Sequence, residues 1–345
     1  MTPTDPASVE LGELGWTDFF AAQLTPGELG LAPARIAGVH RTKLVVISVY
    51  GRSDIALPPQ ETTTNYAVGD WVLLDLSEGR LVRRLERISL LQRRIEGQND
   101  PQLAAANVNS LFIVTSCNAD FNVARLERYL AMANEAGTVP VIVLTKADMV
   151  EDTSSYEADA RALQRDLAVV AVNAKSSEAV TVLSPWLGKG QTVALVGSSG
   201  VGKSTLVNAL SLPRQAAGQN TVQETGSIRE HDAKGRHTTT ARSLHATIGG
   251  AWIIDNPGLR NLHVSDLAAG LETTFAEIVE LSAHCKFRDC SHKHEPGCAV
   301  QAAIARGDLT EARLKRWQKL SEENQKSTPQ HTGPRGNKTI TKKHR

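Results

Sequence analysis

Residues 197–204 read Gly197-Ser198-Ser199-Gly200-Val201-Gly202-Lys203-Ser204, and this stretch decides the fold. An apolar run at residues 192–196 precedes it, and residues 205–210 have a pattern typical of a helix. A strand, a glycine-rich turn and a helix start, in this order, form the phosphate-binding loop of nucleotide-binding proteins. A glycine-rich turn that binds no phosphate would explain the glycines, but it would not require Lys203 and Ser204 at their fixed positions after them. We therefore expect nucleotide phosphates to bind here.

The chemistry of this phosphate loop assigns roles to its residues. Glycines let backbone amides converge on a phosphate, and the helix N-terminus attracts negative charge. Lys203 is expected to reach the β- and γ-phosphates and to act in catalysis, and Ser204 to bind Mg²⁺. We predict that Thr205 also contacts the nucleotide, next to the loop residues quoted above.

A second motif, Thr145-Lys146-Ala147-Asp148, follows an apolar strand and resembles the guanine-specifying Asn-Lys-x-Asp signature of GTPases. The Asp148 carboxylate would accept hydrogen bonds from guanine N1–H and the 2-amino group, a pair of donors that adenine lacks. Lys146 would lay its aliphatic stem on the base. Thr145 replaces the commoner Asn, which we expect to weaken one support to the base and the phosphate loop. If Asp148 is incidental, the chain is instead a metabolic enzyme such as a nucleotide kinase.

A third segment, Asn173-Ala174-Lys175, is placed to complete the base pocket. It resembles the Ser-Ala-Lys element whose backbone amide contacts guanine O6, with Asn173 as a variant. It is significant only because it follows the next apolar strand.

Two further segments match the nucleotide-sensing switches of GTPases. Residues 235–240 read Gly-Arg-His-Thr-Thr-Thr, where a threonine can bind Mg²⁺, although a surface threonine run is the alternative. Asp255-Asn-Pro-Gly258 fits Asp-x-x-Gly, with Asp255 holding Mg²⁺ through water and the Gly258 amide meeting the γ-phosphate.

Leu259 stands where Ras-like enzymes have the glutamine that orients water, so we expect slow intrinsic hydrolysis. We hypothesise that His237 orients water once a partner positions it. A nucleic-acid-binding scaffold that binds GTP without turnover is a further alternative.

The order of these motifs differs from that of ordinary GTPases, which begin with the phosphate loop. Here base recognition comes first, so the domain is predicted to be a circular permutant. Apolar runs at residues 109–115, 139–144 and 167–172 predict parallel strands, and residues 123–136 and 156–166 predict helices that cover them. Leu126, Tyr129, Leu130 and Met132 are expected to face inward.

A cluster of thiols and imidazoles lies near the C-terminus, within the fourteen residues from Cys285 to Cys298. Three cysteines and one histidine can hold a structural zinc ion, with Cys290 as the third thiol and either His292 or His294 as the imidazole. Disulfides explain the pattern less well, because one cysteine stays unpaired unless Cys117 joins; we expect Cys117 to be a buried free thiol.

The N-terminal part is predicted to be a small β-barrel of the OB type. Short β-rich runs occur at residues 35–39, 43–50, 70–75 and 80–85, and about five strands fit into some sixty residues. Six arginines make one end basic, which suits RNA or simply a charged outer face: Arg80, Arg83, Arg84, Arg87, Arg93 and Arg94. Before the barrel, residues 14–20 predict a short helix for packing or docking, and after it the polar residues 95–102 predict a linker.

Composition supports a soluble multidomain protein of 345 residues, with 41% hydrophobic and 22% charged residues. No stretch approaches a membrane span and the N-terminus lacks signal-peptide features, so we expect a cytoplasmic monomer without a membrane partner. The net charge of +1 hides a basic end, residues 326–345, that either contacts nucleic acid or stays solvated and disordered.

Taken together, the motifs resemble the ribosome small-subunit-dependent GTPase A family from about Ala34 to Leu320. The likeness rests on the permuted order, residues 235–240, Cys-x4-Cys-x-His-x5-Cys, and three further stretches: Val68-Gly-Asp-Trp71, Ala105-Ala-Asn-Val108 and His294-Glu-Pro-Gly-Cys-Ala-Val300. Four residues depart from the commoner pattern, which puts nucleotide affinity in question: Asn109, Thr145, Asn173 and Asn256.

The resemblance implies a GTP hydrolase that docks on the small (30S) ribosomal subunit and its rRNA late in maturation. It implies one zinc ion bound by Cys285, Cys290, His292 and Cys298, with His294 outside, and it favours His237 as catalytic and Thr239 over Thr238 for Mg²⁺. The expected parts are an N-terminal extension (1–33), an OB-fold RNA-binding domain (34–97), a permuted α/β GTPase domain (103–262), a mostly helical zinc domain (263–325) and a basic tail (326–345).

Overall fold

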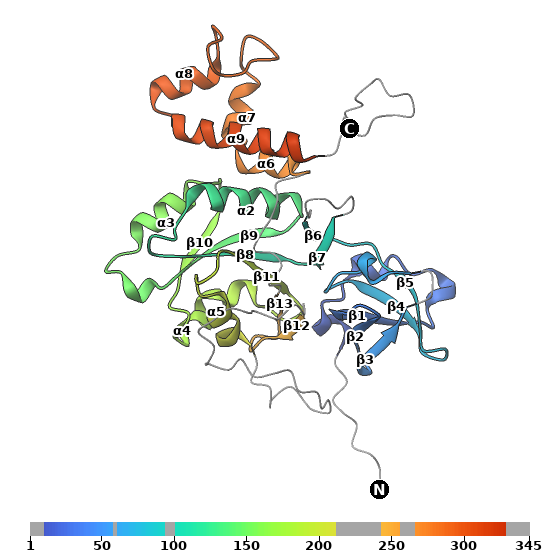
Figure 1. Ribbon diagram of the computed structural model, residues 1–345. Helices are drawn as coiled ribbons and strands as arrows, with labels where there is room; N and C mark the ends of the chain where they lie inside the picture. The colour runs from blue at the N-terminus through green and yellow to red at the C-terminus, as the bar shows by residue number, and fades with distance from the viewer. Residues whose placement is uncertain (1–9, 58–60, 94–100, 212–242, 256–265, 329–345) are drawn as a thin grey trace, which may run out of the picture.

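The computed structural model describes residues 10–57, 61–93, 101–211, 243–255 and 266–328, and Figure 1 shows their arrangement. The centre is a mixed sheet between two helical layers. Its strands, in spatial order, are β10 (Ala168–Ala171), β9 (Val139–Thr145), β8 (Ser110–Ser116), β11 (Thr192–Val196), β13 (Trp252–Asp255) and β12 (Ser243–Ala246). The first five run parallel and β12 is antiparallel. The predicted parallel sheet is thus confirmed.

Helices cover both faces of this sheet, α2 (Val123–Glu135) and α3 (Ser154–Arg161) on one side and α4 (Glu178–Leu183) and α5 (Lys203–Leu210) on the other. The predicted inward residues of α2 are all buried, and Asn122 caps the helix by accepting a hydrogen bond from the Arg125 amide. We expected α3 to extend to residue 166, but it ends at Arg161. Asp166 has a φ of 57°, which an α-helix does not accommodate.

Among the described residues, five antiparallel strands form the N-terminal barrel: β1 (Ala32–Val39), β2 (Lys43–Ser48), β3 (Gly51–Ala56), β4 (Trp71–Asp75) and β5 (Arg80–Arg84). β1 pairs with both β2 and β4, β2 pairs with β3, β4 pairs with β5, and β3 lies beside β5. The expected single strand at 43–50 ends at Ser48, because Gly51 with a φ of 99° turns the chain into β3. The mostly exposed residues of β3 carry no alternating apolar pattern, so the sequence did not indicate it.

The barrel and the central sheet are continuous, since Gly38 of β1 pairs with Ser243 of β12. The chain passes between them through β6 (Leu90–Arg93) and β7 (Gln102–Ala106), which pair antiparallel. The predicted linker at 95–102 is therefore one residue too long, because Gln102 already belongs to β7. Four residues of β6 are too short a run to show periodicity.

The segment before the barrel packs on it, which is one of the two roles expected. The expected helix at 14–20 is shorter, because Gly15 with a φ of 90° ends the preceding turn. It contains a 3₁₀ turn (Leu11–Leu14), the short helix α1 (Asp18–Ala21) and a second 3₁₀ turn (Pro26–Glu28). Leu14 and Phe20 are buried in a cluster with Trp71 of β4.

Within residues 266–328 four helices follow the central sheet: α6 (Ala268–Thr274), α7 (Ala276–Ser282), α8 (Ala299–Arg306) and α9 (Glu311–Ser327). Of these helices α6 packs directly on α2, and α9 lies beside α6 (Figure 1). Contact is closest at Gly270, where a Cβ atom would lie 1.9 Å from the Ala131 carbonyl oxygen. The buried Glu127 carboxylate accepts hydrogen bonds from Arg313 and Arg316 across the same surface.

Candidate functional site

The phosphate loop connects β11 to α5 in the conformation that its glycines permit. Gly197, Gly200 and Gly202 have φ values of 141°, 81° and 96°, and a Cβ at Gly197 would lie 2.1 Å from the Val114 carbonyl oxygen. Only glycine fits such positions. The Lys203 ammonium donates to the carbonyl oxygens of Gly197 and Ser198, so it bends over the loop.

The remaining polar residues of this region face solvent. Ser199, Ser204 and Thr205 are exposed and Ser198 is half-buried, while Val201 is buried among the residues that cover this face of the sheet. Ser204 and Thr205 belong to the first turn of α5. The loop therefore presents backbone and hydroxyl groups at the N-terminus of a helix, where an anion is stabilised.

The predicted base-recognition loop lies beside the phosphate loop. β9 ends at the buried Thr145, and Lys146 has a φ of 58° that starts a 3₁₀ turn over Ala147–Met149. Asp148 in this turn is exposed. The Thr145 hydroxyl is 2.5 Å from the Val201 carbonyl oxygen and 3.0 Å from that of Thr115. The Thr145 hydroxyl thus contacts the phosphate loop directly. The expectation that threonine supports the base and this loop less well than asparagine stays a prediction.

The third predicted segment follows β10. The Asn173 side-chain oxygen accepts a hydrogen bond of 2.9 Å from the Lys175 amide, and the Ser176 amide donates to the Asn173 carbonyl. This turn buries Ala174 and exposes Lys175. A serine also forms such turns, so Asn173 is a conservative variant in structural terms.

These segments meet at one edge of the sheet. β9, β10, β11 and β13 are parallel, and the carboxyl ends of parallel strands share an edge, where ligands of open α/β sheets bind. Asp255 closes β13 at the same edge and is exposed. His237, Thr239 and Gly258 lie outside the described residues.

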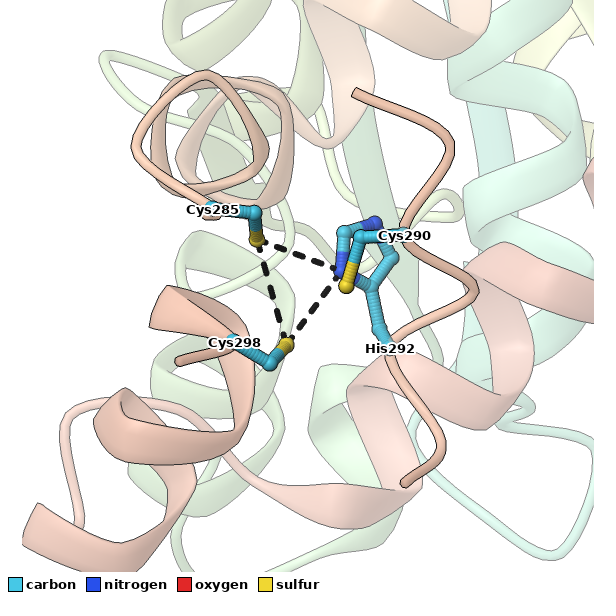
Figure 2. A group of neighbouring side chains, drawn as sticks. All are labelled: Cys285, Cys290, His292 and Cys298. Atoms are coloured by element: carbon cyan, nitrogen blue, oxygen red, sulfur yellow. Dashed lines mark hydrogen bonds between the residues drawn. The ribbon is translucent and has the colours of Figure 1, made fainter. Parts of the chain in front are cut away.

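A second site lies in the helical C-terminal part, where Cys285, Cys290, His292 and Cys298 converge with their ligand atoms within 4.8 Å of one another (Figure 2). His292 Nδ1 is 3.6 Å from Cys285 Sγ and 3.5 Å from Cys298 Sγ, and these two sulfurs are 3.9 Å apart. A tetrahedral zinc ion with bonds of about 2.3 Å to sulfur and about 2.0 Å to nitrogen has edges of about 3.5 and about 3.8 Å. The residues therefore fit zinc. His294 is exposed and is not part of this cluster.

Electrostatics at this cluster also favours a cation. Burial opposes ionisation of Cys285, yet hydrogen bonds from the Ala299 and Val300 amides lower the pKa of its thiol. Burial raises the pKa of Cys290 to about 11, and the neighbouring thiols of Cys298 and Cys285 add to this rise. Three thiolates this close need a positive charge between them.

Residues outside the cluster orient its ligands. Ser282 Oγ donates to the Ile278 carbonyl oxygen at 2.6 Å and lies 3.2 Å from His292 Nε2. Because the serine proton is used, Ser282 accepts from Nε2–H, which leaves the Nδ1 lone pair facing the sulfurs. The Glu295 carboxylate accepts from the amides of Ser291 and Lys293 and so folds the loop. Sequence reasoning missed both residues, although Glu295 lies within a quoted motif.

The barrel arginines that the structure describes are largely engaged in internal contacts, and Arg94 lies outside the described residues. Arg83 donates to Glu28 at 2.6 Å, and Arg87 pairs with the fully buried Asp70 at 2.6 Å. For these two residues the structure favours a structural role over a phosphate-binding one. Arg80 pairs with Glu78, and Arg93 donates to Gln102.

Within the described part of the chain, no helix has both the length and the apolar character to span a membrane. Cys117 is a buried free thiol, as predicted, and burial raises its pKa.

Known proteins resemble this chain in sequence and fold. The family model described as RsgA GTPase matches residues 84–265. A protein of Mesorhizobium japonicum named small ribosomal subunit biogenesis GTPase RsgA is 60% identical over 333 residues, covering 96% of this chain and 95% of its own length. One of Vibrio vulnificus, named small ribosomal subunit biogenesis GTPase RsgA 2, is 47% identical over 325 residues, covering 94% and 90%.

Two solved structures share the fold. The crystal structure of YjeQ from Thermotoga maritima superimposes with a TM-score of 0.61 at 23% identity and covers 85% of this chain and 98% of its own. YloQ, described as a circularly permuted GTPase, gives a TM-score of 0.59 at 23% identity and covers 89% and 100%. The order of motifs along the chain and this likeness agree on a circularly permuted GTPase fold.

Proposed function

The chain belongs to the RsgA GTPase family, and from this premise we propose that it binds the small (30S) ribosomal subunit late in maturation and hydrolyses GTP when bound. The hydrolysis of GTP follows from the family itself. Stimulation of hydrolysis by the subunit, and release of the protein after it, are the further steps of the proposal.

The observation that carries this proposal is the meeting of the base-recognition loop and the phosphate loop through Thr145 and Val201. In the proposed complex, guanine lies between Asp148 and the Asn173–Lys175 turn. The phosphates lie on residues 197–205 with Lys203 at the β- and γ-phosphates. Ser204 and Thr239 would hold Mg²⁺, with Asp255 as a further residue on its side of the site, and the ion would supply positive charge next to the phosphates. The Gly258 amide meets the γ-phosphate.

His237 is proposed to orient the attacking water once the ribosomal RNA positions it. Leu259 has an aliphatic side chain without a polar group, which is the reason for expecting slow turnover in the free protein.

The other parts of the chain are proposed to place this site on the subunit. The pairing of β1 with β2 and β4, and of β4 with β5, supports an OB-type barrel. We propose that this barrel binds rRNA. The four ligands in Figure 2 support one structural zinc ion, which would fix the loop from Cys285 to Cys298. We propose that the protein acts as a monomer in the cytoplasm, with the five parts divided as predicted above.

The test is GTP turnover by the purified chain with and without purified small subunits, with large subunits as the control. We expect stimulation by small subunits and its loss in His237→Ala. Equal rates without subunits, with small subunits and with large subunits would contradict the proposal. ATP competing as well as GTP for binding would contradict the guanine assignment and favour a metabolic enzyme.

A further inference from the structure

Two motifs that serve neither the nucleotide site nor the metal site meet at the joint between the barrel and the central sheet. They are residues 68–71 and residues 105–108. Val68 forms a parallel bridge with Ala105, and the Ala106 amide donates to the Val68 carbonyl oxygen at 2.9 Å. A Cβ at Gly69 would lie 2.1 Å from the Ala106 carbonyl oxygen, so the two backbones are in direct contact. The joint has no room for a side chain at this point.

Asn107 fastens the joint with its side chain. Its amide nitrogen donates to the Gly69 carbonyl oxygen at 3.0 Å, and its amide oxygen accepts from the Ile88 amide at 2.9 Å. Its φ of 54° is a conformation that asparagine tolerates better than most residues. Only 8% of Asn107 is exposed, so these hydrogen bonds are shielded from water.

Arg35 of β1 connects the barrel to the strand of the phosphate loop. Its guanidinium donates to the hydroxyl of Thr192, the first residue of β11, at 2.6 Å and to the Leu14 carbonyl oxygen at 2.7 Å. It is 1% exposed. Thr192 is held in turn by Asn109, whose side-chain oxygen accepts from the Thr192 amide at 2.8 Å. A chain of polar contacts, buried at Arg35 and Thr192, thus runs from the barrel to the start of β11.

The same joint also contacts β13, the strand that ends in Asp255. Ile254 Cδ1 lies 3.2 Å from the position of a Cβ at Gly69. In addition, Trp252 Nε1 donates to the Glu13 carbonyl oxygen in the segment that packs on the barrel. The barrel is therefore fixed against two strands that lead into nucleotide-site residues, and in β13 the contact at Ile254 is next to Asp255 itself.

We infer that Asn107 and Arg35 are positioning residues for subunit-stimulated hydrolysis, because they set the orientation of the barrel relative to β11 and β13. This inference rests on the proposed function. A small subunit bound to the barrel then contacts the nucleotide site in a single orientation. A misplacement of about 1 Å at a reacting centre costs about 100-fold in rate, so a small rotation at the joint suffices to lose stimulation.

The variant that tests this is Asn107→Gly, because glycine accepts the positive φ and removes both side-chain hydrogen bonds. We expect intrinsic turnover to stay within about twofold of wild type, while the stimulation by small subunits falls about tenfold or more. Thr192→Val, which removes the hydroxyl that accepts from Arg35 but keeps the shape and leaves the Leu14 carbonyl as an acceptor, should act the same way. Asn65→Gly, an exposed substitution in the barrel, is the matched control and should leave both rates unchanged.

A covalent rescue separates orientation from general destabilisation. Gly38 and Ser243 are directly paired across the two sheets, at a spacing that a disulfide can bridge. Adding Gly38→Cys and Ser243→Cys to Asn107→Gly should restore stimulation when oxidised, and reduction should remove it again. Asn107→Gly without the two cysteines, oxidised in parallel, is the control.

Unchanged stimulation in both Asn107→Gly and Thr192→Val would overturn the inference while the proposed function stands. The inference would also be overturned if the variants lost intrinsic and stimulated turnover to the same extent and the disulfide restored neither. A wild-type chain that subunits do not stimulate would instead contradict the proposed function, and the inference with it.

Discussion

The hydroxyl of Thr145 lies 2.5 Å from the backbone carbonyl oxygen of Val201, and this contact joins two loops that are 56 residues apart in the chain. Thr145 is fully buried, and the partner is a peptide group of the phosphate loop. In a trans peptide the N–H points away from the C=O, so fixing the Val201 carbonyl also fixes the direction of the Gly202 amide. Base recognition and phosphate binding are therefore mechanically connected through one hydroxyl group.

Thr145→Val should weaken binding of GTP and GDP alike. The change keeps the shape but leaves a buried carbonyl unpaired, which costs about 1–3 kcal/mol, so we expect the Kd for nucleotide to rise about tenfold. Titration with a fluorescent guanine nucleotide measures this. Thr145→Ser keeps the hydroxyl and should bind almost as wild type; equal affinity of the Val variant and wild type would show that the contact does not matter.

Removing the metal should loosen the C-terminal helices. Purified protein is expected to contain about one zinc ion per chain, since four ligands fit one tetrahedral site. Removing the zinc ion with a chelator should destabilise α7 and α8, so that their backbone amides exchange hydrogen faster. Adding zinc back should restore slow exchange. Cys298→Ser should contain little zinc from the start. Metal-free wild-type protein with full protection of these helices would refute the structural role.

Ser282→Ala should lower zinc affinity without touching a ligand. The serine accepts from His292 Nε2–H and so presents Nδ1 to the metal, and loss of such an outer partner costs about 10- to 100-fold in affinity. Competition with a coloured chelator measures the change. Thr273→Ala is the matched control, because the Thr273 hydroxyl also donates to the carbonyl four residues earlier in its helix but is not part of the metal cluster. Equal affinities of the two variants would argue against the role of Ser282.

Glu127→Gln should detach the C-terminal helices from α2. Glu127 is fully buried and accepts from Arg313 and Arg316, and breaking a buried pair costs about 3–5 kcal/mol. We expect faster hydrogen exchange in α9. The exposed pair of Glu280 and Arg165 connects the same two parts of the molecule, and Glu280→Gln should cost less than about 1 kcal/mol. Similar exchange in both variants would contradict the anchoring role of Glu127.

Local motifs were readable from the sequence because their chemistry lies in neighbouring residues. The phosphate loop needs its glycines, lysine and serine at fixed offsets, and the three thiols and His292 fall within fourteen residues. The buried strands could be predicted because both faces of a parallel sheet are covered, so their residues are apolar in continuous runs. β3 and β6 escaped prediction, since a short or exposed strand has no such signal.

What the sequence by itself determined is the set of chemical groups and the strands and helices that carry them. Only the tertiary structure decided which distant groups become partners: Thr145 with Val201, Arg35 with Thr192, Glu127 with Arg313, and Arg87 with Asp70. The physical reason is that a hydrogen bond or ion pair depends on distances of a few ångströms, which packing sets between segments far apart in the chain. A run of arginines therefore looks the same in sequence whether its members bind phosphate or pair with a buried carboxylate. The structure distinguishes the two cases, because it shows whether a buried carboxylate lies beside the arginine.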